Sequence, residues 1–166
     1  MAQIEVATLA GGCFWGMEDL LRKLPGVLES EVGYTGGTVP NATYELVKTG
    51  KTGHAEAIQL RFDPQILSYE NLLLFFFKIH DPTTEGQQGN DIGSQYRSAI
   101  FYHSENQREI AQEILDRVNK SKAWKFPLVT EIKPLEKFYR AEDYHQDYLE
   151  KHPAGYTCHF LRNLNF

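Results

Sequence analysis

One cysteine of this 166-residue chain lies in a stretch suited to nucleophilic chemistry. Cys13 stands in GGCFWG, residues 11–16, where an apolar strand pattern gives way to a helical one. A thiol at the N-terminal end of a helix meets unpaired N–H groups and the positive end of the helix dipole, and both favour the thiolate. The alternative is a small core residue, the usual role of a free cysteine. Cys13 alone does not separate these two interpretations.

The neighbours of Cys13 add the elements of a binding pocket. Its flanking glycines allow a ligand or a backbone segment to approach closely. Phe14 and Trp15 place two large rings in the first turn of the expected helix. These rings either pack in the core or form a slot beside the thiol for a small apolar group such as a methyl.

An acidic side chain lies within a strand pattern that is otherwise largely apolar. In GHAEAIQLRF, strict alternation puts Glu56 on the same face as Ile58 and Leu60. An acid on an apolar face must be neutral or paired, and burial raises a carboxyl pKa so that the group can donate a proton. A carboxylate paired with Arg or Lys is the alternative interpretation.

Three further polar side chains lie in or beside irregular segments. Tyr44, Asp91 and Tyr96 need partners if they face a pocket, although Tyr is common here and a structural role is the stronger expectation for any one of them. Residues 80–95 form a long polar loop rich in Gly. Loops of this length in compact domains tend to be functional or disordered, so we expect it to form one wall of a site.

The second cysteine, Cys158, stands near the other end of the chain. Two cysteines are too few for a disulfide scaffold, so a bond between them would be transient. No Cys-x-x-Cys or His-x-x-x-His spacing indicates a metal site. A Cys-His hydrolase would need one of three histidines to meet Cys13 in space, and no local signal selects among them: His54, His80 and His145.

The elements that must position these residues follow from periodicity and from turn signals. Strands are predicted at 4–9, 27–34, 55–62, 96–102 and 128–132, and helices over 68–80 and 104–121. Ser104 and Gln107 form a capping box at the start of the latter helix. A further helical segment is expected over 141–152, followed by an irregular tail. The predicted fold class is α+β, a two-layer sandwich with a mixed sheet and a ferredoxin-like βαββαβ core plus extra elements.

Composition limits the class of protein. The length predicts one domain over 1–166. Seventeen Lys and Arg against 22 Asp and Glu give a formal net charge of −5, which disfavours a nucleic-acid or polybasic membrane partner. No run approaches the ~20 apolar residues of a membrane span, and the N-terminus has no basic start. We therefore expect a cytoplasmic monomer that acts on a small or peptidic group without a metal or cofactor.

Five blocks of the sequence together resemble the A-type peptide methionine sulfoxide reductases. They are GGCFWG, TYELVKTGKTGHAEAI, GNDIGSQYRS, AEDYHQDYL and GYTCHF, in the order of that family and over nearly the whole chain. The resemblance implies reduction of methionine S-sulfoxide, free or in proteins, as repair after oxidative damage. It also implies thioredoxin as the reductant.

The resemblance implies a role for each candidate residue. Cys13 is the nucleophile, whose thiolate attacks the sulfoxide sulfur and becomes a sulfenic acid. Phe14 and Trp15 hold the S-methyl group, and Glu56 donates the proton. Tyr44 and Tyr96 bind the sulfoxide oxygen, Asp91 supports the site from the long loop, and Cys158 is the resolving cysteine that forms a disulfide with Cys13.

The chain departs from many relatives at Lys48, where they carry an extra cysteine, so a relay of three cysteines is not expected. Two other function classes remain open at this point. One is another thiol enzyme, either a peroxidase or a Cys-His hydrolase, and the other is a non-catalytic module whose aromatic pocket binds oxidised or methylated side chains. Glu56 argues against the hydrolase, which needs an imidazole base rather than a neutral acid. The second cysteine argues against the binding module, which has no use for it.

Overall fold

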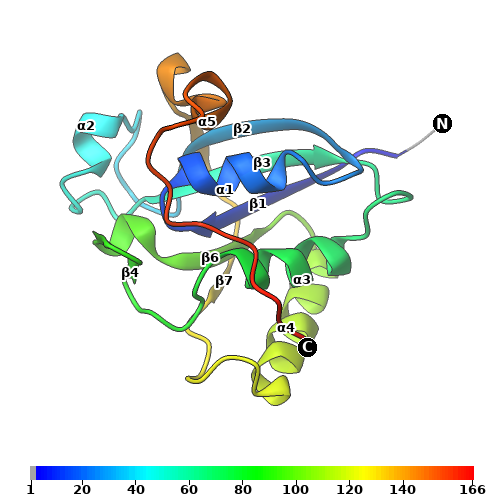
Figure 1. Cartoon of the computed structure of the whole chain (residues 1–166). Helices are drawn as coiled ribbons and strands as arrows, with labels where there is room; N and C mark the ends of the chain where they lie inside the picture. The colour runs from blue at the N-terminus through cyan, green and yellow to red at the C-terminus, as the bar shows by residue number, and fades with distance from the viewer. Residues whose placement is uncertain (1–2) are drawn as a thin grey trace.

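The structure is a computed structural model that describes residues 3–166. A mixed sheet forms its centre (Figure 1). Its six strands run in the order β7-β6-β1-β3-β2-β8. Neighbouring strands are antiparallel except for β6 and β7, which are parallel. The strands are β1 (Glu5–Gly11), β2 (Val27–Thr35), β3 (Ala55–Phe62), β6 (Ser98–Tyr102), β7 (Glu131–Pro134) and β8 (Phe138–Arg140).

Three longer helices accompany the sheet, and Figure 1 shows α1 and α3 on the same side of it. They are α1 (Phe14–Leu21), α3 (Tyr69–Ile79) and α4 (Glu105–Ser121). The remaining elements are short: α2 (Tyr44–Val47), β4 (Gln87–Gln88), β5 (Asp91–Ile92), α5 (Tyr148–Lys151) and the 3₁₀ turns η1 (Ser94–Tyr96) and η2 (Asp143–His145). The α+β class with a mixed sheet is therefore as predicted.

The core follows from the period-2 pattern of the strands. Leu9, Ile58 and Leu60 are fully buried in one cluster with side chains of α1, α3 and α4. Each such side chain contributes about 1.5–3 kcal/mol on burial. Alanines of β1, β3 and β6 point to the opposite face, where Phe101 packs on them. The predicted alternation of β3 is confirmed, so Glu56 lies on the face that packs against the helices.

The caps of the helices are partly as predicted. Ser104 Oγ accepts the Gln107 N–H at 3.2 Å, which is the first half of the predicted capping box. The second half differs, because the Gln107 side chain accepts the N–H of His103 at 2.9 Å instead of that of Ser104. Its amide nitrogen also donates to the Val6 carbonyl, and this bond to β1 sets the direction of the side chain.

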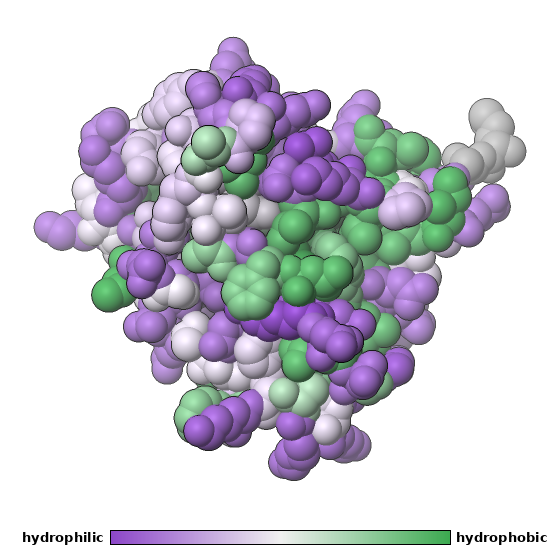
Figure 2. Space-filling view, viewed as in Figure 1, coloured by the Kyte–Doolittle hydropathy of each residue, from purple (hydrophilic) through white to green (hydrophobic). Residues whose placement is uncertain are grey.

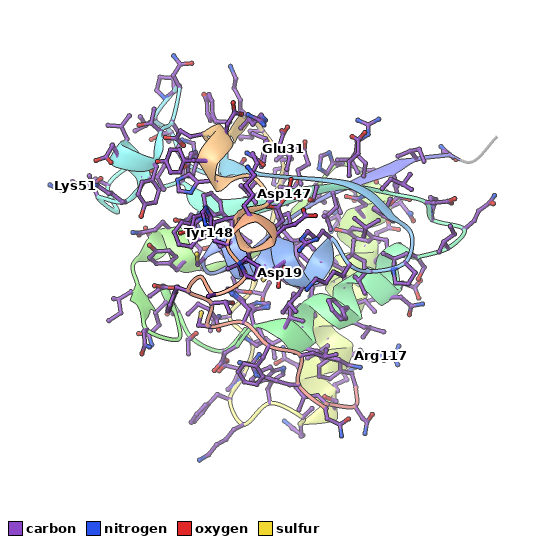
Figure 3. The ribbon with its side chains drawn as sticks, turned by 45° about the horizontal axis from the view of Figure 1, so that its top comes forward. Asp19, Glu31, Lys51, Arg117, Asp147 and Tyr148 are labelled. Atoms are coloured by element: carbon purple, nitrogen blue, oxygen red, sulfur yellow. The ribbon has the colours of Figure 1, made fainter. Side chains whose placement is uncertain are left out.

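The segment 141–152 differs from the expected continuous helix. It divides into η2 and α5, and Asp147 between them has a left-handed φ of 52°. The N–H of Asp147 donates to Glu18 Oε1 of α1 at 2.7 Å. This tertiary bond accounts for the interruption of the helix. Figure 3 shows Asp147 and its neighbour Tyr148 on the segment that lies over α1.

Other differences concern the ends of elements. The strand predicted over 96–102 begins at Ser98, because 94–96 form η1, and the strand predicted at 128–132 is observed as β7 at 131–134. β8 and the small β4–β5 hairpin inside the 80–95 loop were not predicted. Within residues 3–166, no helix is both long enough and apolar enough to span a bilayer.

Candidate active site

Cys13 occupies the N-cap position of α1, directly after the turn that ends β1. Gly12 makes this turn with φ of 102°, and a Cβ there would lie 2.6 Å from the Gln88 side chain, so only glycine fits. Burial raises the pKa of the Cys13 thiol well above its usual range, and the nearby Glu56 raises it further, while the Trp15 N–H lowers it. Burial therefore outweighs the effect of the helix end, and this environment favours the protonated thiol over the predicted thiolate.

Glu56 lies in β3, opposite Tyr34 of β2. Its side chain is 2% exposed, and Oε1 accepts the N–H of Phe14 at 3.2 Å, in the residue next to Cys13. Burial raises the pKa of Glu56 to about 8. Among residues 3–166, no Arg or Lys forms an ion pair with it. The structure therefore favours the neutral acid over the paired carboxylate.

The two rings after Cys13 occupy different depths. Phe14 is 1% exposed and packs against Tyr34 and His145, with ring centroids 5.7 and 5.1 Å away. Trp15 is half-buried; its Nε1 donates to His145 Nδ1 at 3.0 Å, and its ring stacks on Tyr148 at 3.7 Å. Trp15 is thus held on two sides while part of it stays accessible. Phe14 lies behind it in the core.

Tyr44, Tyr96 and Asp91 come together around the acid and the thiol. Burial raises the pKa of Tyr96, and Coulomb interactions with Glu56 and Asp91 at the pH where the tyrosine titrates raise it further. Burial likewise raises the pKa of Tyr44, and Coulomb interactions with Glu56 and Cys13 raise it further. Charge effects of this kind require groups that lie near one another. Neither tyrosine hydroxyl forms a hydrogen bond within residues 3–166, so both are available to an oxygen atom of a ligand.

Cys158 returns to this site from the far end of the chain. Its Sγ lies 3.9 Å from Asp91 Oδ2 and 3.9 Å from the Gln88 carbonyl, on the predicted loop wall. Tyr156 donates to the same Asp91 oxygen at 3.3 Å. Both cysteines are free thiols. The tail is irregular as predicted, and it packs against the site.

The histidines that a Cys-His hydrolase would need have other partners. His54 bonds to the Val39 carbonyl, and His80 is fully buried between the Phe76 carbonyl and Ser98 Oγ. His145 accepts from Trp15. In the part of the chain that the structure describes, none of the three bonds to Cys13, and no group of three or more His, Cys, Asp or Glu is placed to hold a metal ion.

The structure adds Glu142 and Tyr148, which the sequence analysis did not assign to the site, and it gives His145 a role other than that of a hydrolase base. Glu142 accepts from the Tyr34 hydroxyl at 2.9 Å and from the Tyr44 N–H at 3.0 Å, and so fixes α2 beside the site. His145 and Tyr148 hold Trp15, as described above. All three come from the block AEDYHQDYL, which was the only sequence signal for them.

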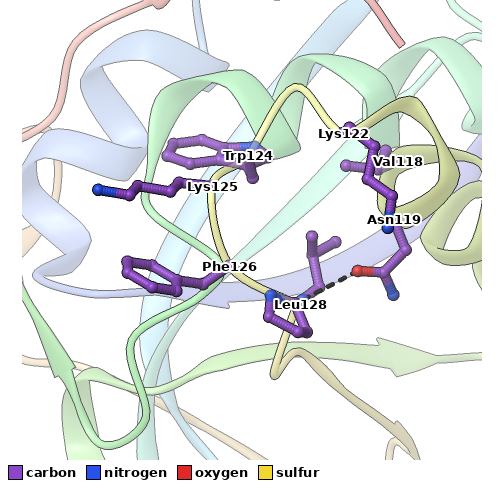
Figure 4. A pocket seen from close by; sticks show the side chains of 8 residues that line it. Val118, Asn119, Lys122, Trp124, Lys125, Phe126 and Leu128 are labelled. Atoms are coloured by element: carbon purple, nitrogen blue, oxygen red, sulfur yellow. Dashed lines mark hydrogen bonds between the residues drawn. The ribbon is translucent and has the colours of Figure 1, made fainter.

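A surface hollow of about 250 Å³ lies elsewhere, beside the C-terminal end of α4 (Figure 4). Its lining contains no thiol and no acid; it consists of Val118, Asn119, Lys122, Trp124, Lys125, Phe126, Pro127 and Leu128. The hollow therefore offers neither the nucleophile nor the proton donor found around Cys13.

The chain is similar to known proteins over nearly its whole length. The family model described as peptide methionine sulfoxide reductase matches residues 5–165. The peptide methionine sulfoxide reductase MsrA of Pseudomonas fluorescens is 57% identical over 160 residues, 96% of this chain and 75% of that protein. The reduced form of Mxr1 from Saccharomyces cerevisiae superposes with a TM-score of 0.91 at 39% identity, covering 97% of this chain and 93% of that one. Mxr1 in complex with Trx2 gives a TM-score of 0.67 at 28% identity, covering 97% and 91%.

Proposed function

The chain belongs to the peptide methionine sulfoxide reductase family, and on this premise we propose which of its residues carry the reaction. The enzyme reduces methionine sulfoxide to methionine in a reaction linked to thioredoxin, the class of partner with which Mxr1 is found in its complex with Trx2. The single observation that supports the residue assignment is the pair of Cys13 and Glu56. A half-buried thiol and a buried acid whose pKa is raised to about 8 lie on adjacent elements, and the N–H of Phe14, the residue after Cys13, donates to Glu56 Oε1.

In the first step, Cys13 Sγ attacks the sulfoxide sulfur while Glu56 protonates the sulfoxide oxygen. The attack forms a bond between Cys13 Sγ and the substrate sulfur. The oxygen, now a hydroxyl, then passes to Cys13 Sγ: the substrate S–O bond and the bond between the two sulfurs break, the Cys13 S–O bond forms, and methionine leaves a sulfenic acid on Cys13. One sulfoxide and one thiol give one methionine and one sulfenic acid, so no proton is consumed or released overall. Glu56 regains from the reacting thiol the proton that it gives. A pKa of about 8 keeps this acid protonated at neutral pH.

The remaining groups bind the substrate. The free hydroxyls of Tyr44 and Tyr96 donate to the sulfoxide oxygen, where negative charge grows in the transition state. The accessible part of Trp15 contacts the S-methyl group, and Phe14 supports that wall from the core. Asp91 holds the loop side of the site through its contacts with the tail.

In the second step, Cys158 converts the sulfenic acid on Cys13 into a disulfide. The Cys158 Sγ–Cys13 Sγ bond forms, the Cys13 S–O bond breaks, and the oxygen leaves as water with the proton of Cys158. The dithiol of thioredoxin then reduces this disulfide by exchange.

Reduction of the two sulfoxide epimers tests the proposal. Peptides with one S- or one R-sulfoxide are incubated with the enzyme and either dithiothreitol or thioredoxin. We expect only the S epimer to yield methionine, and Cys13→Ser to yield none with either reductant, because a hydroxyl is a poor nucleophile at neutral pH. Methionine formation by the Ser variant would refute the role of Cys13. Equal use of the R epimer would refute the proposed specificity.

Finer features of the molecule are also part of the proposal. The order β6-β1-β3-β2, with α1 and α3 as the crossovers, supports a ferredoxin-like βαββαβ core. The six-stranded sheet draws on residues 5 to 140, which supports one domain over the chain. A cytoplasmic monomer without a nucleic-acid, membrane or cofactor partner stays a prediction from the sequence.

A further inference from the structure

The residue after Cys158 attaches the tail to the strand that carries Cys13. His159 is 7% exposed, and its Nε2 lies 2.7 Å from the Gly11 carbonyl oxygen, two residues before Cys13. A carbonyl oxygen can only accept, so Nε2 carries the proton and Nδ1 keeps a lone pair. Figure 1 shows the tail passing the start of α1 on its way to α3 and α4.

The turn before α1 leaves room for this imidazole. A Cβ on Gly12 would lie 3.1 Å from His159 Nε2. A Cβ on Gly16, one turn into the helix, would collide with His159 Nδ1 and with Thr157 Oγ1. Both glycines face the same ring, so the absence of two side chains creates the place that His159 fills.

The ring of His159 also lies beside the thiol of Cys158. His159 Nδ1 lies 3.9 Å from Cys158 Sγ, on the side that carries the lone pair. The His159 N–H donates to Thr157 Oγ1 at 3.1 Å, which folds the backbone locally around Cys158. Burial lowers the pKa of His159 to about 4, so the ring stays neutral near pH 7 and keeps one nitrogen as donor and the other as acceptor.

The tail has a second attachment farther along. The Arg162 N–H donates to the Lys78 carbonyl at 3.0 Å, and its guanidinium lies over the Trp124 ring. Phe160 and Leu161 between the two attachments are both 57% exposed, and Figure 2 shows apolar atoms gathered on this face of the molecule. His159 is therefore the attachment nearer to the reacting sulfurs.

We propose that His159 is a positioning residue of the recycling step: by bonding to the Gly11 carbonyl it holds Cys158 within reach of the Cys13 sulfenic acid. The inference rests on the proposed role of Cys158 as the resolving cysteine. Disulfide formation expels the oxygen of the sulfenic acid as water, with the proton of the Cys158 thiol. His159 changes no bond in this step and supplies proximity only.

Thiol counting in a single turnover tests the inference. The wild type starts with two thiols, retains one after methionine release and none after disulfide formation, so the two steps are timed separately. In His159→Ala we expect methionine release at the wild-type rate and loss of the second thiol slowed about tenfold, the order of effect of one lost buried hydrogen bond. His159→Gln keeps an N–H donor and should recover most of the rate. Asn163→Ala, an exposed position of the same tail, is the matched control and should behave as wild type.

Three results decide the inference. Selective slowing of the second step in His159→Ala, with recovery in His159→Gln, supports it. Disulfide formation at the wild-type rate in His159→Ala overturns it, and so does equal slowing of both steps, which would indicate general loss of structure. Cys158→Ser is measured in parallel: if this variant keeps full thioredoxin-driven turnover, the resolving role itself fails, and that outcome is distinct from a failure of His159 alone.

Discussion

Glu56→Gln is expected to change the pH dependence of stability in a direction set by burial. The folded protein raises the pKa of this carboxyl from 4.5 to about 8. Between these values the folded state keeps a proton that the unfolded chain releases. Stability from the protonated, buried acid is therefore fully present below pH 4.5 and is lost as the pH rises towards 8. The neutral amide of Gln has no such titration.

The size of the effect follows from the pKa shift. At 1.36 kcal/mol per pKa unit, the free energy of unfolding of the wild type should fall by about 3 to 4 kcal/mol relative to the Gln variant between pH 5 and pH 8. The amide can still accept the Phe14 N–H, as Glu56 Oε1 does. Any fixed cost of burying the amide is the same at both pH values and cancels in this difference.

Urea unfolding of the reduced proteins at pH 5, 6, 7 and 8 measures this quantity. Glu113→Gln, at an exposed glutamate of α4, is the matched control. In parallel, the variant should release methionine on the order of 10²-fold more slowly in a single turnover, the scale of a positioned general acid. A stability difference that stays constant from pH 5 to pH 8 would refute the buried neutral acid. A wild-type rate would refute the proton donor.

Three further substitutions test separate parts of the structure. Trp15→Ala removes the stack on Tyr148 and the bond to His145. It should lower the free energy of unfolding by about 2 kcal/mol and kcat/KM by roughly tenfold. If urea unfolding changes and kcat/KM does not, Trp15 has no role in methyl binding. Tyr96→Phe should lower the rate of methionine release by roughly 10²-fold with unchanged unfolding, because its hydroxyl has no partner in the described chain; a normal rate would exclude oxygen binding by Tyr96. Lys122→Gly should stabilise the protein by up to about 1 kcal/mol at unchanged activity, because φ is 59° at this C-cap of α4; a lower urea midpoint would contradict this.

Local patterns in the sequence determined much of this protein. Period-2 alternation placed Glu56 on the same face as Ile58 and Leu60, and the change from a strand to a helical pattern located Cys13 at the start of α1. Such patterns are readable because each depends on residues only a few positions apart. Matching blocks then identified the family, and with it the expected partners of Cys13.

Tertiary packing alone decided the rest. The neutrality of Glu56 depends on what surrounds it, and at the Cys13 thiol burial outweighs the pKa-lowering effect of the helix end. The break at Asp147 depends on a bond to Glu18, 129 positions away, and the attachment of His159 on one to Gly11, 148 positions away. Contacts at such separations leave no periodic trace in the chain, because they form only when the sheet and its helices have brought the partners together.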